Sequence, residues 1–576
     1  MTNNREETMK ATVDSTETVA APGVVPAVTA DVAGMTSAER ARMPLTLDVV
    51  KAAAEQHGVC VRPVLREVVD LDTGEVRMVG VRCNSTVASK CPACADRNRR
   101  SRMAQCREGW HLDHEPVAER ETATRDQIEL VTYRADLTAE YRQTQREQDA
   151  VQVEDLREAI READSDLRRE GVRGNLPSVD RPAAPAPVRS TRRRQDAPNL
   201  PRRKVTKTTV GREFAGKYRP STFVTVTLDS YGKVRSDGTP VDPSTYDYRR
   251  AARDAVHFAS LIDRWWQNLR RVVGWDVQYF GTVEPQKRIT PHAHFAVRGS
   301  IPHAVVRQVT AATYLQVWWP DHDEIRYSGD RLPVWDMRAK GFVDPDTNVP
   351  LTSWADAVAD LDTPAHVVEF GSQVHSKGIL GGTEEAGRHI GYLTKYLVKS
   401  ISEVVAVDES QRVSEHADRL AAELAITPCS ERCAVWLLYG VAPKGAHSRM
   451  TPGRCRSKAH RRETLGLPGR RVLVSRRWSG KTLAEHKSDR AAFVREALAA
   501  AGIAKPEGTD RTRLMWAPVR AGDPHAPSRA ELLMQMIAQR LKWRAEYEQA
   551  QAVLVALPRP APDEGLNLSA THREAA

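Results

Sequence analysis

The sequence predicts an α+β protein with a central antiparallel sheet and flanking helices, two small zinc-stabilised modules, and helical and disordered extensions. Three observations support this fold class. Residues 222–228 and 276–284 alternate polar with apolar side chains and are rich in β-branched residues, which is typical of strands. Residues 247–272, between them, repeat apolar side chains at helical spacing and precede Gly274, a common helix terminator. Two groups of cysteines have the spacing of metal ligands.

The composition favours a polyanionic partner. The 576-residue chain has a formal net charge of +10, and its basic residues are unevenly distributed. A basic protein without a nucleic-acid partner is the alternative that charge alone leaves open. No run of about 18 apolar residues predicts a membrane span, and the polar N-terminus lacks a signal-peptide pattern. We therefore expect a cytoplasmic protein whose eight cysteines are thiols or metal ligands, not disulfides.

A chain of this length is expected to form several domains. Composition and motifs predict the following segments: a disordered leader (1–44), a four-cysteine zinc-binding module (45–115), a charged helical insertion with a proline-rich and basic linker (116–205), a central α+β domain (206–405), a basic zinc-binding module with three cysteines and one histidine (406–520), a C-terminal helix (521–557) and a disordered tail (558–576).

The first cysteine group has four members, Cys60, Cys83, Cys91 and Cys94. The turn from Cys91 to Cys94 can direct two sulfurs at one ion. A hairpin over residues 64–81, with Asp72-Thr73-Gly74 at its tip, would bring the other two cysteines together. We predict a structural zinc site, because a module of this size buries little core. A redox pair or unliganded thiols are the alternatives.

Residues 116–180 are dense in Glu, Arg, Asp and Gln with sparse apolar positions, so one or two exposed charged helices are expected. The proline-rich residues 182–187 indicate a stiff linker. Basic residues predominate from Arg189 to Arg219. An arm that contacts a nucleic-acid backbone is the interpretation we prefer for this run over a merely disordered arm.

Two histidines in the segment Pro291–Phe295 are candidate metal ligands. Side chains alternate along a strand, so His292 and His294 would present both imidazoles on one face. A turn at 285–290 makes a hairpin with the preceding strand, and Glu284 at its end can approach both histidines. Two imidazoles and one carboxylate leave coordination positions open, which suits Mg²⁺ or Mn²⁺ bound to a phosphate. Alternatively, Glu284 pairs with Arg288 and the histidines are surface residues.

A helix is predicted at residues 390–400. Tyr392 and Tyr396 would lie one turn apart on one face, and a lysine follows each after three residues, Lys395 and Lys399. A tyrosine hydroxyl is a poor nucleophile unless positive charge stabilises the phenolate, which an ammonium and a divalent metal would supply. Core tyrosines with solvated lysines are the alternative for this pattern taken alone.

In combination, the strand 222–228, the His292-Ala293-His294 strand and the Tyr-x-x-Lys helix resemble the three motifs of the HUH (His-hydrophobic-His) endonuclease superfamily. The chain is similar to rolling-circle replication initiators of actinobacterial plasmids of the RepSA kind. The similarity lies in the order of the three motifs, in the cysteine groups and in the segment Val472–Thr482. The paired tyrosines also resemble the two-tyrosine motif in gene A proteins of small single-stranded DNA phages. The resemblance covers most of residues 50–500 and excludes both termini and the charged insertion.

This resemblance implies that segment 206–405 is an HUH endonuclease domain. It implies His292 and His294 as metal ligands with Glu284 as the third. It also places Tyr392 and Tyr396 at the nucleophile positions, assisted by Lys395 and Lys399, without saying which tyrosine cuts first. The expected partners are origin DNA, both single-stranded and duplex, and a host helicase and polymerase.

The second cysteine group follows the tyrosine helix and consists of Cys429, Cys433, Cys455 and His460, which predicts a second zinc-stabilised module. Two cysteines on one helical face are the alternative. Basic residues predominate from Lys444 to Arg490, so this module is expected to contact duplex backbone. The segment 479–482 only partly matches a nucleotide-binding loop, because Ser475 stands where that motif needs glycine. A built-in helicase is therefore not expected.

A last helix is predicted at 528–557, with a capping box and an apolar side formed by Leu532, Leu533, Met536, Ile537 and Leu541. It either packs on the body or mediates self-association. The resemblance to these initiators implies an enzyme that nicks and rejoins one DNA strand at an origin through a 5′-phosphotyrosine. A relaxase or transposase of the same superfamily, or a non-enzymatic zinc-stabilised DNA-binding regulator, are the rival interpretations.

Overall fold

The computed structural model describes residues 47–110, 123–172, 199–209, 220–359, 361–395, 410–467, 471–500, 514–520 and 522–556, with residues 112, 176, 179 and 397. The expected leader and tail lie outside these residues. Contacts divide the chain into two compact units. The four-cysteine unit comprises Met1–Ala104, Thr394–Ser400 and Leu483–Ala576, and the sheet unit comprises Gln105–Leu393 and Ile401–Thr482. Each unit is described by itself.

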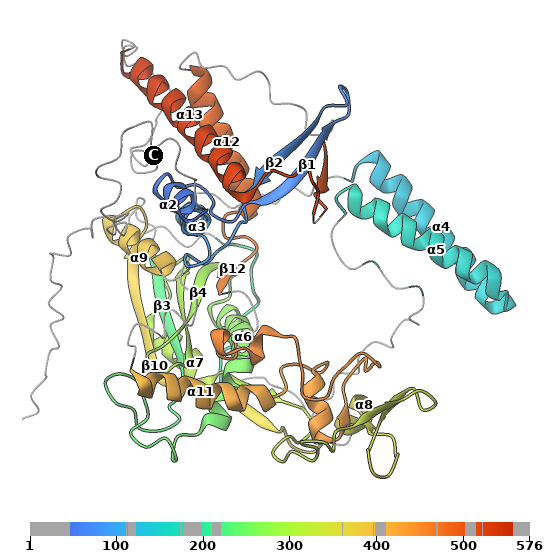
Figure 1. The fold of residues 1–576 in the computed structure, drawn as a ribbon. Helices are drawn as coiled ribbons and strands as arrows, with labels where there is room; N and C mark the ends of the chain where they lie inside the picture. Colours follow the sequence, from blue (N-terminus) through green and yellow to red (C-terminus); the bar gives the residue numbers. More distant parts are fainter. Residues whose placement is uncertain are drawn as a thin grey trace, which may run out of the picture. The chain divides into compact units, whose positions relative to one another are not determined.

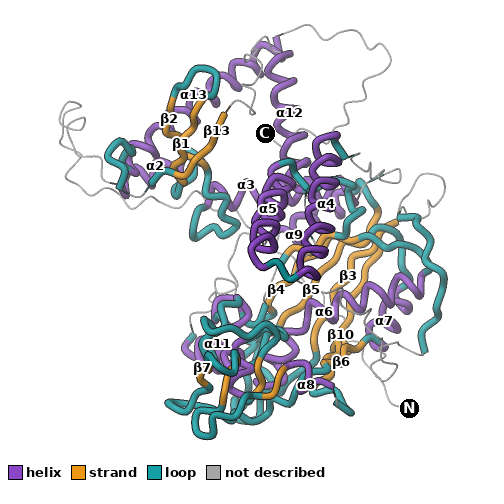
Figure 2. Tube along the Cα trace, turned by 90° about the vertical axis from the view of Figure 1, so that its right-hand side faces the viewer, coloured by secondary structure: helices purple, strands orange, loops and turns teal. Residues whose placement is uncertain are grey.

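A six-stranded antiparallel sheet forms the centre of the sheet unit (Figure 1). Its strands follow the spatial order β12 (Val472–Val474), β4 (Tyr279–Pro285), β5 (Pro291–Val297), β3 (Pro220–Leu228), β10 (His366–Leu380) and β6 (Tyr314–Val317). Figure 2 shows β4, β5, β3 and β10 side by side. The register of β10 shifts between Phe370 and Val374, so its first part pairs with β6 and its second with β3. The predicted antiparallel sheet with helices is confirmed.

One face of the sheet packs on α6 (Tyr248–Val273), the helix predicted at 247–272. The rings of Trp266 and Tyr279 stack with centroids 3.9 Å apart, and Trp265 stacks on Phe295. A Cβ at Gly281 would lie 2.2 Å from Phe295 Cδ1, so this strand position must be glycine for the aromatic ring to sit against the backbone. These large rings, together with many aliphatic side chains, form the core of the sheet unit.

The face of the sheet that points away from α6 carries the alternate side chains of each strand. The core with α6 includes three residues of β5, namely Ala293, Phe295 and Val297. His292 and His294 therefore point to the other face, as the sequence predicts. The helix α9 (Glu384–Lys395) lies against this face, where the rings of His389 and Phe223 meet with centroids 4.8 Å apart. The candidate site is consequently built between the sheet and α9.

Other elements of the sheet unit support α6 and the edges of the sheet. The helix α11 (Gln411–Ile426) packs on α6, and α7 (His303–Ala312) packs on α6 and β10. The short elements are β7 (Val334–Asp336), β8 (Gly341–Val343), β9 (Thr352–Ser353), α8 (Trp354–Ala359), β11 (Val441–Ala442) and the 3-10 helices η4 (Ala434–Tyr439), η5 (Lys458–His460) and η6 (Arg462–Thr464). The indoles of Trp436 and Trp478 are fully buried, so both tryptophans are core residues.

The charged insertion forms a helical hairpin, as predicted. It consists of α4 (Arg125–Glu147) and α5 (Ala150–Arg169), which pack on each other through Tyr141, Leu156 and Ile160. Thr124 and Gln127 form a capping box at the start of α4. The hairpin therefore carries a small core of its own in an otherwise charged surface.

The four-cysteine unit contains a three-stranded sheet of order β13-β1-β2, with β1 (Val64–Asp70), β2 (Val76–Val81) and β13 (Leu514–Pro518). The hairpin β1–β2 is the predicted one, and Asp70 caps its turn by accepting hydrogen bonds from the amides of Asp72 and Thr73. The helices are α2 (Leu47–Gln56), α3 (Pro92–Trp110), whose C-terminal end extends past residue 104 into the sheet unit, α12 (Leu483–Ala500) and α13 (Arg529–Ala556).

The C-terminal helix α13 packs on α2 and β2, so its apolar side serves the four-cysteine unit. The capping box is present. The backbone amide of Ser528 donates to the Glu531 carboxylate, and the backbone amide of Glu531 donates to the Ser528 hydroxyl. Leu533 and Ile537 are buried, but Leu541 is exposed and does not line the inner side, which corrects that expectation. The apolar side of α13 ends at Ile537, because residues 538–545 are exposed. None of the helices in the described part of the chain combines the length and apolar character that crossing a bilayer requires.

Candidate active site and metal centres

Glu284, His292 and His294 converge on the face of the sheet that α9 approaches. In the antiparallel pair β4–β5, Glu284 lies directly opposite His292, so both side chains project on the same side. One ligand atom from each of the three residues lies within 4.8 Å of the others. The imidazole rings of the two histidines meet edge to face with centroids 4.5 Å apart. The hairpin therefore assembles the three donors that the sequence indicated.

Burial determines the protonation of this group. It lowers the pKa of His292 to about 4 and that of His294 to about 3, so both imidazoles are neutral at pH 7 and able to bind a metal. Burial also raises the pKa of Glu284 to about 7, against the opposing charge of Arg471. The Nδ1 atom of His292 is buried and makes no hydrogen bond within the described residues. A neutral imidazole whose buried Nδ1 makes no hydrogen bond to a described residue, beside a desolvated carboxylate, fits a divalent cation.

Two neighbours of the group were not indicated by the sequence. The Thr225 hydroxyl lies 2.8 Å from Nδ1 of His294, which fixes the ring and leaves Nε2 facing the site. Arg471, which immediately precedes β12, lies near Glu284, and its Nε donates to the carbonyl of Val283 at 3.3 Å. Period-two alternation could have placed Thr225 on this face once the strand pairing was known. No local signal could have placed Arg471.

Arg288 does not pair with Glu284. Its guanidinium donates to the carbonyl oxygens of Leu228 and Asp229 at 2.6 and 2.8 Å, and to the Gln286 side chain at 2.8 Å. These bonds tie the β4–β5 turn to the end of β3. Arg288 therefore holds the hairpin, and the alternative of a simple Glu284–Arg288 ion pair is not what the structure shows.

Tyr392 lies beside the three ligands. Its hydroxyl is 3.2 Å from Nε2 of His294, and the two ring centroids are 5.1 Å apart. Tyr392 is 41% exposed, so a substrate can reach its hydroxyl. Lys395 is exposed in the last turn of α9. The helix starts six residues before the expected 390 and ends at Lys395, and Tyr396 and Lys399 lie outside the described residues.

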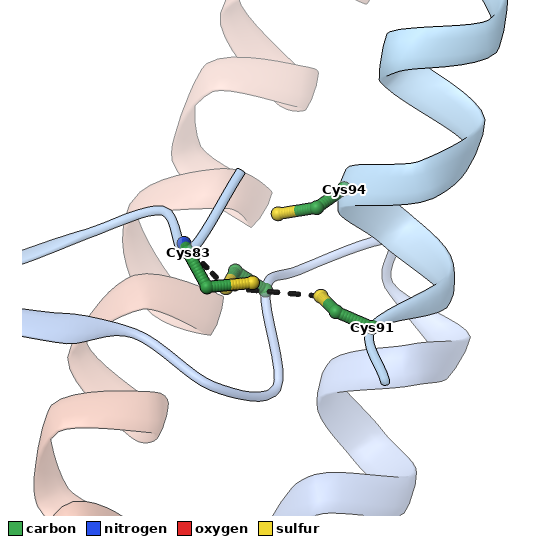
Figure 3. A group of neighbouring side chains, drawn as sticks. Cys83, Cys91 and Cys94 are labelled. Carbon is green, nitrogen blue, oxygen red and sulfur yellow. Dashed lines mark hydrogen bonds between the residues drawn. The ribbon is translucent and has the colours of Figure 1, made fainter. Parts of the chain in front are cut away.

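The first cysteine group is assembled in the four-cysteine unit. The sulfurs of Cys60, Cys83, Cys91 and Cys94 all lie within 4.8 Å of one another. Figure 3 shows three of them directed at a common point, Cys83 from the end of the hairpin and Cys91 and Cys94 from the start of α3. The sulfurs of Cys60 and Cys91 are 3.8 Å apart, too far for a disulfide. A tetrahedral zinc with bonds of about 2.3 Å would place sulfurs about 3.8 Å apart, so this group could hold zinc.

The second group is assembled in the sheet unit from Cys429, Cys433, Cys455 and His460. The sulfurs of Cys429 and Cys455 are 3.8 Å apart, and Cys433 Sγ lies 3.4 Å from His460 Nε2. The Nδ1 atom of His460 donates to the carbonyl of Leu424 at 2.8 Å, which orients the ring and directs Nε2 toward the cysteines as a possible ligand. Cys429 precedes η4 in a loop, so the alternative of two cysteines on one α-helical face does not apply. This group could also hold zinc.

A family model described as "Replication initiator protein, pSAM2" (RepSA) matches residues 46–539. The match includes both cysteine groups, the β4–β5 hairpin and α9. No curated protein and no solved structure matches the chain.

Proposed function

The chain belongs to the RepSA family of replication initiator proteins, and from this premise we propose that it nicks and rejoins one DNA strand at the origin of a plasmid or integrative element. The site would belong to an endonuclease domain of the HUH superfamily and would start rolling-circle replication. The observation that carries this proposal is the 3.2 Å approach of the Tyr392 hydroxyl to His294, one of three clustered metal-ligand candidates.

In this proposal the ligands of the catalytic metal are Glu284, His292 and His294. Mg²⁺ or Mn²⁺ bound there would polarise the scissile phosphate and neutralise its developing charge. Thr225 keeps the His294 ring in the orientation that exposes Nε2. Glu284 and His294 are buried and His292 is half-buried, which limits competing water and strengthens electrostatic interactions within the site.

Tyr392 is the proposed nucleophile of the first cut. A bond forms between its phenolic oxygen and the phosphorus while the bond from phosphorus to the 3′ oxygen breaks. The phenol loses its proton and the 3′ oxygen gains one, so the products are a 5′-phosphotyrosine and a free 3′-hydroxyl that primes synthesis. The phosphotyrosine conserves the energy of the cleaved bond, and a later hydroxyl can reseal the strand. Tyr396 is proposed as the second nucleophile, and Lys395 and Lys399 as cations that stabilise the phenolates.

Nicking and rejoining do not unwind the duplex, so another protein would have to separate the parental strands. A host helicase and polymerase are therefore proposed partners, together with origin DNA. The two cysteine groups would hold structural zinc and take no part in the chemistry. A conjugative relaxase or a transposase would use the same site, and the DNA substrate distinguishes them: an initiator cuts a replication origin in preference to a transfer origin or a transposon end.

The test is incubation of the zinc-loaded protein with single-stranded origin DNA and Mg²⁺ or Mn²⁺, followed by peptide mapping of the covalent adduct. The adduct is expected on Tyr392, and Tyr392→Phe should reduce cleavage by on the order of 10⁴-fold. Tyr133→Phe, which alters an exposed tyrosine of α4, is the matched control and should leave cleavage unchanged. Full cleavage by Tyr392→Phe, or an initial adduct on another residue, would contradict the assignment. Absence of any adduct would favour the non-enzymatic DNA-binding regulator.

A further inference from the structure

A basic cavity lies beside the first cysteine group, entirely within the four-cysteine unit. It has a volume of about 490 Å³ and is lined by Arg62, Pro63, Val64, Cys83, Ser85, Lys90 and Arg529. Three of these side chains are cationic and none is acidic. No aromatic side chain lines the cavity, so it offers no platform on which an unpaired base could stack.

Hydrogen bonds join this cavity to a second set of basic residues. The amide of Asn98, on α3, donates to the carbonyls of Asn84 and Ser85 in the cavity loop at 3.3 and 3.0 Å. The ammonium of Lys487, on α12, donates to the oxygen of the same Asn98 side chain at 3.1 Å. Segments far apart in the sequence therefore bring their cations to one loop.

The second set consists of Arg82, Arg97, Lys487, Arg490 and Arg540, from the end of the β1–β2 hairpin and from α3, α12 and α13. Partial burial of each charged group, and then the positive charges around it, lower the pKa of Arg97, whose side chain is otherwise exposed, and of Lys487. Gathering like charges opposes folding of the unit. Within the described residues, no acidic side chain forms an ion pair with Arg82 or Arg97.

The same helix shows how surface arginines are ordinarily neutralised. Arg99 and Arg100 of α3 both approach the carboxylate of Asp96, and Arg100 donates to it at 2.8 Å. Arg97, two and three residues away, has no such partner in the described part of the chain and is exposed. The helix therefore presents two arginines that share one carboxylate and one arginine, Arg97, that has none among the described residues.

We infer that the cavity and the adjoining cations of the four-cysteine unit form a binding surface for the phosphodiester backbone of duplex DNA. The surface consists of Arg62, Arg82, Lys90, Arg97, Lys487, Arg490, Arg529 and Arg540. A phosphate backbone supplies a regular row of negative charges that can pair with these basic side chains. Contacts to the backbone do not require aromatic side chains that stack on bases. The inference rests on the proposed function for the identity of the nucleic acid, and it gives the four-cysteine unit the task of holding the duplex.

The experiment measures the salt dependence of binding of the full-length, zinc-loaded protein to a fluorescently labelled origin duplex, between roughly 50 and 200 mM salt. Arg82→Gln/Arg97→Gln should lower the slope of log affinity against log salt by about 1.8, or about 0.9 for each lost phosphate contact. Arg99→Gln/Arg100→Gln also removes two positive charges, but from arginines that share the Asp96 carboxylate. This control variant should leave the slope close to that of the parent.

Equal slopes for the parent and both variants would overturn the inference, and so would an equal fall in both variants. Zinc content of Arg82→Gln/Arg97→Gln should match the parent, and its thermal midpoint should equal or exceed that of the parent, because the change relieves repulsion. A loss of either would assign the two arginines to the fold and overturn the proposed surface. If an unstructured polyanion binds with the same salt slope, and Arg82→Gln/Arg97→Gln lowers that slope by the same amount, the choice of duplex DNA is overturned. Cleavage of single-stranded origin DNA is read separately, so failure of the nicking proposal leaves the slope comparison intact.

Discussion

Replacing Glu284 by glutamine is expected to stabilise the metal-free protein at alkaline pH. Burial raises the pKa of this carboxyl to about 7 from an ordinary value of 4.5. Each pKa unit corresponds to about 1.4 kcal/mol, so keeping Glu284 charged in the fold costs about 3 kcal/mol above pH 7. The folded state binds a proton that the unfolded state has released, so stability falls as the pH rises from about 4.5 through about 7. Glutamine has the same shape without the charge, and it removes this cost.

Urea unfolding of the zinc-loaded protein without Mg²⁺ or Mn²⁺ measures the effect, with fluorescence of the buried Trp265 and Trp266 as the signal. Glu284→Gln should exceed the parent by less than about 1 kcal/mol at about pH 5 and by about 3 kcal/mol at about pH 8.5. Glu369→Gln, which alters an exposed carboxylate of β10 in the same sheet, should match the parent at both pH values. Added Mn²⁺ should stabilise the parent in proportion to its binding and leave Glu284→Gln unchanged.

Two results would refute this reasoning. A Glu284→Gln protein that is less stable than the parent at both pH values would mean that the carboxylate contributes to the fold, for example through its 3.3 Å hydrogen bond from Thr282. A variant that Mn²⁺ stabilises as strongly as the parent would remove Glu284 from the ligand set.

Three further predictions concern positions around the site and the cysteine group. Thr225→Val, which removes the 2.8 Å contact with His294, should weaken Mn²⁺ binding by about 10- to 100-fold in a titration, whereas Thr225→Ser should retain the parental affinity. Cys91→Ser should lower zinc from about two to about one per chain in metal analysis, and an unchanged content would contradict zinc binding there. Gly281→Ala would place a Cβ 2.2 Å from Phe295 Cδ1 and should destabilise the protein by about 1 to 3 kcal/mol in urea unfolding; a neutral effect would show that the ring can move.

The parts of the site that the sequence predicts are those carried by local patterns. The alternation of β5 places His292 and His294 on one face, and a short turn brings Glu284 opposite His292. Thr225 reaches His294 across 69 residues of sequence, and Arg471 reaches Val283 across 188 residues. Pairing between such distant strands depends on the whole sheet, so no local periodicity identifies it.

The tyrosine helix shows a different limit. Ala386, Ile390 and Leu393 are buried and lie at helical spacing, and the Thr383 hydroxyl accepts from the amide of Ala386. Of these, Thr383 and Ala386 are start signals for α9 that precede the expected residue 390. Gly387 follows them directly, interrupts the helical pattern in the sequence and favours a later start. Packing of the three apolar side chains outweighs the glycine cost in the fold.

Basic residues in the sequence do not identify the DNA-binding surface, because many are used within the protein. Between Lys444 and Arg490, several side chains form ion pairs inside the sheet unit: Lys444 with Glu431, Arg462 with Asp418, Arg477 with Asp276, and Lys481 with Glu108. A cation that already has a carboxylate partner releases fewer counterions when it meets a phosphate. Lys444→Gln should therefore change the salt dependence of duplex binding less than Arg97→Gln. An equal change would mean that sequence charge alone, and not its pairing in the fold, determines where the duplex is held.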